Sequence, residues 1–210
     1  HVGAVETVVL PVGGKILSGL AIDHFGLFNS KVQPISAYRL AGAGLAAAGM
    51  LLAVYGRGKS SRVGPRPKLI WRVMGILVGV YAALQAAFNG NLTRMLGSSI
   101  ASGFVSYATG TILLLLLVVF SNQLPHKTTR GRWWMWLGGP VGALFVVGMA
   151  QLVPHLGTGV TLLVVLIGQL LGSMAIDHFA LFGARKAHVT FFRLIGVAVL
   201  AGGMYVYYTF

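Results

Sequence analysis

Seven long stretches of apolar residues dominate the sequence and limit the folds that it can adopt. Each is about 20 residues long, which is the length of a helix that crosses the hydrocarbon core of a bilayer. They are continuous and do not alternate between apolar and polar residues, so they predict helices rather than barrel strands. We expect spans near residues 2–22, 36–55, 70–89, 97–120, 133–152, 156–176 and 190–209. The sequence therefore predicts an all-α integral membrane protein.

The charged residues support this class. They make up 9% of the 210 residues, against about a quarter in soluble domains, so a soluble globular protein is excluded. The net charge of +13 is compatible with nucleic-acid binding, but the cations lie in the short gaps between apolar stretches, as topology signals do. We expect a lipid bilayer and no nucleic acid as partner. The chain has no cysteine, which excludes disulfides and thiolate metal sites.

The chain also contains an internal duplication. Residues 21–28 (AIDHFGLF) return as residues 175–182 (AIDHFALF), at an offset of 154 positions. The same offset aligns Arg39 with Arg193 and needs no gap elsewhere, so chance is a poor explanation.

This register predicts the organisation of the chain. We expect residues 1–56 to hold the last two spans of a first copy, residues 57–68 to form a basic linker, and residues 69–210 to form a complete five-span second copy. The first copy would then lack roughly 86 residues at its front, so we expect a fragment of a parent of about 296 residues.

Lys and Arg residues predict the orientation. Residues 57–68 carry five of them, the richest gap, and should be cytoplasmic. Alternation then places Lys127 and Lys186 inside and Lys31 outside. The two Asp-His-Phe loops face opposite sides because five spans separate them. Such an inverted repeat is typical of secondary transporters, whose substrate site lies near the middle of the membrane.

Small residues recur at four-residue spacing, which allows helix backbones to approach closely in lipid. We expect a packing role for these pairs. They are Gly42/Ala46, Gly44/Ala48, Gly138/Gly142 and Ala198/Gly202.

Three stretches of the second copy carry a family resemblance. They are residues 83–89 (ALQAAFN) with 96–98 (LGS), residues 138–144 (GGPVGAL), and residues 168–171 (GQLL) followed by 176–179 (IDHF). The chain resembles the drug/metabolite transporter superfamily, in its EamA- and YdcZ-like branch of five-span and fused ten-span bacterial proteins. The resemblance implies a ten-helix transporter of the bacterial inner membrane that exports small metabolites or drugs.

Six polar residues in the spans are candidates for a substrate cavity: Glu6, Lys15, Gln85, Asn89, Gln151 and Gln169. Ionisable groups in hydrocarbon usually serve a function, so Glu6 is a candidate carrier of a coupling proton or ion. The alternatives are that Glu6 lies at a helix end and that Lys15 extends to the interface. The four amides are equally compatible with bonds between helices, and the resemblance favours Gln169 slightly for the cavity. Lys15 occupies the position of Gln169 in the other copy, which leaves open whether both serve one role.

Two further expectations concern local structure. Pro11, Gly13 and Gly14 precede Lys15, so a kink or an unwound turn is expected there. The serines Ser98, Ser102 and Ser106 share one helix face, and we expect them to bond carbonyls of their own helix.

The two Asp-His pairs suggest metal or acid–base chemistry at first sight. A zinc site needs three or four ligands, and no further His-rich or Cys-rich cluster lies near either pair, so we expect no metal. Each aspartate closes a span, and an arginine 16 residues later opens the next. We therefore expect structural Asp23–Arg39 and Asp177–Arg193 pairs that tie helical hairpins together at the interface.

These features favour a secondary transporter that works by alternating access between two bundles. Catalysis is not expected, because the sequence shows no nucleophile beside a base and no phosphate-binding loop, and no cofactor is implied. The main alternative is a structural or regulatory membrane subunit that transports nothing. A channel would need rings of like charge or carbonyl filters, which the sequence does not offer.

Overall fold

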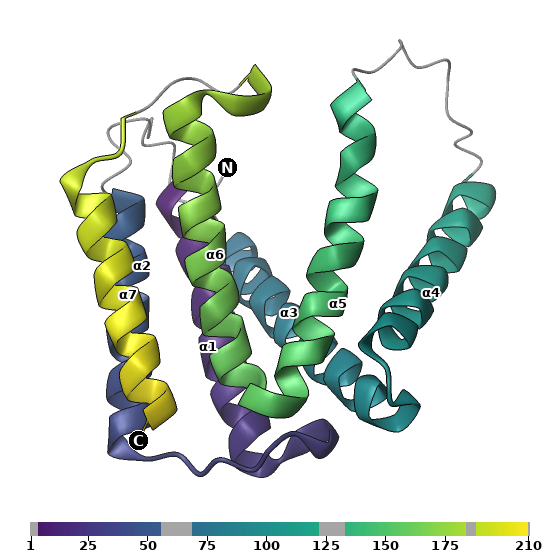
Figure 1. The fold of residues 1–210 in the computed structure, drawn as a ribbon, viewed down its shortest axis with the longest axis horizontal. Coiled ribbons are helices and arrows are strands. Elements are labelled where there is room, and N and C mark those ends of the chain that lie inside the picture. Colours follow the sequence, from purple (N-terminus) through teal and green to yellow (C-terminus); the bar gives the residue numbers. More distant parts are fainter. Residues whose placement is uncertain (1–3, 56–68, 122–132, 184–187, 210) are drawn as a thin grey trace.

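Seven long helices form the bundle in the computed structural model, which describes residues 4–55, 69–121, 133–183 and 188–209 (Figure 1). They are α1 (Ala4–Phe25), α2 (Ala37–Tyr55), α3 (Leu69–Leu96), α4 (Ser99–Phe120), α5 (Gly138–Leu156), α6 (Thr158–Phe179) and α7 (Phe191–Thr209). Short 3-10 turns follow or precede three of them, namely η1 (Leu27–Asn29), η2 (Trp133–Leu137) and η3 (Leu181–Gly183). Each long helix contains a segment long and apolar enough to cross a membrane. The predicted all-α membrane fold is confirmed.

The predicted end of one span is wrong, and one alternative for α1 is not observed. Helix α3 continues to Leu96, well beyond the predicted end at residue 89. The extra turns are stabilised by packing, since Thr93 is buried and its hydroxyl donates to the Asn89 carbonyl at 2.9 Å. Of the two alternatives expected before Lys15, a kink or an unwound turn, the unwound turn is not observed, since α1 runs as one α-helix through Pro11. A proline in a span is tolerated where neighbouring helices shield the freed carbonyl.

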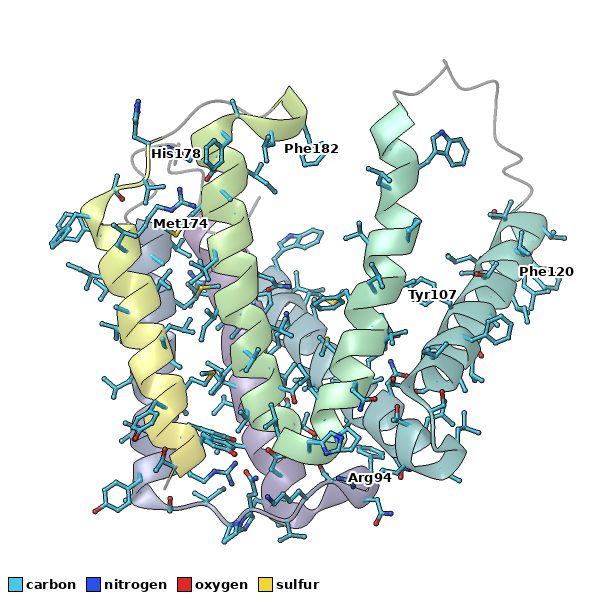
Figure 2. All side chains as sticks on the ribbon, in the orientation of Figure 1. Arg94, Tyr107, Phe120, Met174, His178 and Phe182 are labelled. Carbon is cyan, nitrogen blue, oxygen red and sulfur yellow. The ribbon has the colours of Figure 1, made fainter. Side chains whose placement is uncertain are left out.

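The two Asp-His-Phe segments lie at opposite ends of the bundle. Consecutive helices alternate in direction, so that η1 lies at the end where the chain's C-terminus is drawn and η3 lies at the other end (Figure 1). The end of the bundle that holds η3 is the η3 end, and the end that holds η1 is the η1 end. Figure 2 shows His178 and Phe182 at the η3 end and Arg94 at the η1 end.

Helices α2 and α7, which occupy equivalent places in the two copies, pack against each other through glycines. A Cβ atom added to Gly42 would lie 2.7 Å from the Gly203 carbonyl oxygen, and one on Gly49 would lie 2.6 Å from the Gly196 carbonyl oxygen. The partners move towards the start of α7 as α2 advances, so the helices are antiparallel. Adding 154 to residues 42, 46, 49 and 53 gives 196, 200, 203 and 207, which are the facing positions. The interface is therefore formed by the same positions of both copies.

The predicted packing pairs were only partly right. Gly42 and Ala46 lie in the α2–α7 interface, whereas a Cβ on Gly44 or Gly202 would meet nothing within 4 Å. A four-residue spacing occurs on several faces of these glycine-rich helices, and the spacing alone does not say which face has a neighbour.

We expect Gly49→Val to destabilise the protein strongly, because the added side chain would overlap backbone atoms of α7. Overpacking of this kind costs about 1–3 kcal/mol or more. The measurement is the melting temperature of the purified protein in detergent. Gly44→Val is the matched control on the same helix, and it should leave the melting temperature nearly unchanged. Equal effects of the two substitutions would contradict the interface.

Candidate functional site

A cavity lies between α1, α3, α5 and α6, with a volume of about 110 Å³. Its position is near the middle of the membrane, because Lys15 and Gln169 stand midway along α1 and α6, which are each 22 residues long. The wall is polar on one part and apolar on another. It is formed by Lys15, Ala82, Gln85, Ala86, Asn89, Phe145, Val146, Met149, Leu162, Val165 and Gln169.

Four of the six predicted cavity residues meet at this wall: Lys15, Gln85, Asn89 and Gln169. Gln151 does not line it, and its side chain is exposed on α5. Glu6 belongs to the first turns of α1, but its side chain lies outside the described residues. The tertiary structure thus separates four of the candidates from Gln151, which the sequence had proposed together with them.

Lys15 and Gln169, which correspond to each other in the duplication, face the same cavity. An inverted repeat brings equivalent positions together around its pseudo-two-fold axis, which explains why one position of each copy contributes. The cavity is therefore built from both copies. One copy supplies an ammonium group where the other supplies a carboxamide.

Close packing of α1 on α3 positions Lys15. A Cβ atom on Gly14 would lie 3.2 Å from the Cα of Gly79, and one on Gly79 would lie 2.9 Å from the backbone nitrogen of Lys15. Glycine at both positions lets the two backbones approach closely. The Lys15 side chain therefore begins directly beside α3, the helix that carries Gln85 and Asn89.

Asn89 is fixed by serines of α4. Ser102 donates to the Asn89 backbone carbonyl at 2.8 Å, and Ser106 donates to the Asn89 side-chain oxygen at 2.5 Å. The expectation that these serines bond carbonyls of their own helix is therefore wrong. Ser98 caps α4 by accepting from the Ala101 amide at 3.3 Å. Asn89 is a rigid part of the wall because its oxygen is engaged.

The other polar groups of the wall are not engaged. Among the residues that the structure describes, Lys15, Gln85 and Gln169 have no hydrogen-bond or ion-pair partner. Polar groups inside a membrane usually find partners within the protein. These three side chains are available to a ligand.

A second polar cluster lies at the η1 end and is centred on Asp23, which is fully buried. The Asp23 carboxylate accepts the backbone N–H groups of Thr158 and Gly159, both at 2.8 Å, and the Ser30 hydroxyl at 3.2 Å. It therefore caps α6, whose first amides have no partner in their own helix. Gly157 has a φ of 88°, a conformation that suits glycine and permits the tight turn from α5 into α6.

Arg39 completes this cluster. Its guanidinium lies 3.6 Å from the Asp23 carboxylate and donates to the Gln33 side chain at 2.7 Å. It also lies over the Tyr207 ring, 4.4 Å from the centroid. The structure thus brings Asp23 and Arg39 together, but the shortest bonds of Asp23 go to the start of α6.

At the η3 end, Asp177 and Arg193 are in direct contact. The Arg193 guanidinium donates to the Asp177 carboxylate at 3.0 Å and to the Ser173 hydroxyl at 3.1 Å. Both charged residues are buried. Among the described residues, no group of three His, Asp or Glu side chains is placed to hold a metal ion.

We expect Asp23→Ala to lower stability by about 3–5 kcal/mol, because it leaves a buried arginine and two helix amides without their acceptor. Unfolding of the detergent-purified protein measures this. Charge reversal sharpens the test. The double variant Asp23→Arg with Arg39→Asp should recover little of the stability lost in Asp23→Arg, since arginine offers no acceptor to the Thr158 and Gly159 amides.

The matched reversal, Asp177→Arg with Arg193→Asp, should recover part of the stability lost in Asp177→Arg, because an ion pair of opposite polarity can form. Full recovery of stability in the reversed Asp23–Arg39 double variant would contradict the capping role of Asp23.

The fold defines a multi-pass membrane protein with a partly polar cavity midway along α1 and α6. Residues 1–52 and 70–206 match the family described as "Putative inner membrane exporter, YdcZ", a family of the drug/metabolite transporter superfamily. The chain belongs to this family and is a multi-pass inner-membrane protein. No curated protein and no solved structure matches it.

Proposed function

We propose that the protein is a secondary transporter that exports small molecules by alternating access, with the cavity as its substrate site. The observation that carries this proposal is a set of polar side chains that have no partner among the described residues and face one cavity midway along α1 and α6. A purely structural subunit gains nothing from such groups, because unpaired polar atoms in hydrocarbon lower stability. The family supports the class, since its members are described as exporters.

The contacts at the η1 end support a state in which the bundle is closed at one end only. There Asp23 caps α6, and the Arg94 guanidinium donates to the Pro154 carbonyl at 2.9 Å. The ring of Phe28, which lies in η1, packs on a phenylalanine ring of α3. Helices α5 and α6 are joined at this end by Gly157 alone and diverge towards the η3 end (Figure 1).

The charge pattern supplies the orientation. The basic gap at residues 57–68 follows α2 and should be cytoplasmic, which places the η1 end outside. We infer that the structure is closed towards the outside, and that export requires the contacts at the η1 end to separate. The proposed division into a partial first copy, a linker at 57–68 and a second copy from residue 69 is part of this mechanism, because the two copies would move against each other.

Ligand screening by thermal shift tests the proposal. Amphipathic metabolites, amino acids and cationic drugs are added to the detergent-purified protein, because a ligand that binds only the folded state raises the melting temperature. We expect the stabilising compound to bind Gln85→Ala and Gln169→Ala about 2–10-fold more weakly, since each substitution removes one hydrogen bond.

Gln151→Ala is the matched control, because this glutamine lies outside the cavity. It should bind the compound as the wild type does. A hit whose affinity is the same in all three variants would place the site elsewhere. If no compound stabilises a folded protein, the non-transporting subunit becomes the better description.

A further inference from the structure

Lys15 is the only charged side chain at the wall of the cavity among the described residues. It is half-buried and has no ion-pair partner in the described part of the chain. An ammonium group that sits in a membrane without a counter-charge is costly, and such groups usually mark a substrate or ion path. The arrangement leaves one positive charge to be neutralised by something that enters the cavity.

The two acidic residues whose side chains are described do not compensate for it. Asp23 is held by the start of α6, and Asp177 is bonded to Arg193. The third and last acid of the chain, Glu6, is nine positions from Lys15 on α1. Nine residues are two and a half turns, so the two positions lie on opposite faces of the helix. A cationic ligand would therefore meet a like charge at the described wall and no carboxylate.

Uncharged donors line the same cavity as the ammonium group. The carboxamides of Gln85 and Gln169 have no hydrogen-bond partner in the described part of the chain, and each carries two N–H donors. The rest of the wall is apolar and includes Phe145, Met149 and Leu162. A single fixed charge matches a monovalent anion better than a doubly charged one, and the apolar surface matches a ligand with a hydrophobic body.

We propose that the cavity binds a small organic monocarboxylate, with its carboxylate on the Lys15 ammonium group and its apolar part against Phe145 and Met149. The carboxamides of Gln85 and Gln169 complete the anion site as hydrogen-bond donors. This inference rests on the proposed function and specifies its substrate class.

Three probes of one size test the charge preference: benzoate, benzamide and benzylamine, each titrated calorimetrically into the purified protein. We expect benzoate to bind, benzamide to bind at least about tenfold more weakly, and benzylamine not to bind, because a charge-assisted bond is roughly twice as strong as a neutral one. Equal or tighter binding of benzylamine would overturn the proposal.

Variants assign the effect to Lys15. Lys15→Gln should weaken benzoate binding at least about tenfold, and Lys15→Arg should restore most of it, because arginine keeps the charge and the donors. Lys31→Gln, which removes an exposed lysine outside the cavity, is the matched control and should bind as the wild type does. Unchanged benzoate affinity in Lys15→Gln would overturn the proposal.

The ligand-free melting temperature separates this role from a structural one. Replacing an unpaired ammonium group by a neutral amide should not lower it, whereas loss of a structural lysine would. If benzamide or benzylamine binds through Gln169 while benzoate does not, the anion site is wrong and the transporter stands. If none of the three probes binds, the anion site is wrong, and the wider thermal-shift screen decides the transporter independently.

Discussion

Hydrocarbon offers no hydrogen-bond partner, and this constraint governs where each polar group of the chain lies. The buried charges at both ends of the bundle are bonded within the protein: Asp23 to the start of α6 and Asp177 to Arg193. Asn89 is bonded to two serines of α4. Against this background, Lys15, Gln85 and Gln169 stand out because they have no partner among the described residues. All three line one cavity, and this is why we propose it as a binding site.

The two copies share a framework but differ in their polar chemistry. The α2–α7 interface uses equivalent positions of both copies, so the glycines serve one structural purpose in each. The aspartates have the same local sequence, yet Asp23 caps a helix of the other copy and Asp177 contacts the arginine of its own hairpin. Lys15 and Gln169 likewise differ at one shared cavity. The repeated positions thus share a packing role in α2 and α7, but the polar residues at the two ends and at the cavity differ in their contacts.

Much of this arrangement could be predicted from the sequence. Hydropathy gave seven helices, because span length is set by the thickness of the bilayer. Spacing of the Asp and Arg residues indicated which hairpins they could join. The errors have physical causes: the end of α3 depends on the burial of Thr93, and the partners of Ser102 and Ser106 depend on the contact of α4 with α3. The capping of α6 by Asp23 joins residues more than 130 positions apart, and no local pattern indicates it.

The sequence by itself determined the class of the protein, the number and alternation of its helices, and the pool of polar residues that could serve a function. It could do so because hydropathy and charge act locally, residue by residue, along each span. Only the tertiary structure decided which of those residues share a cavity. The residues alone do not separate Gln151 from Gln169, and the resemblance favours Gln169 only slightly, but helix rotation and glycine-mediated approach place Gln169 at the cavity with Lys15 and leave Gln151 outside it. Those rotations are set by packing between distant helices, which is why the site emerges only when the bundle is assembled.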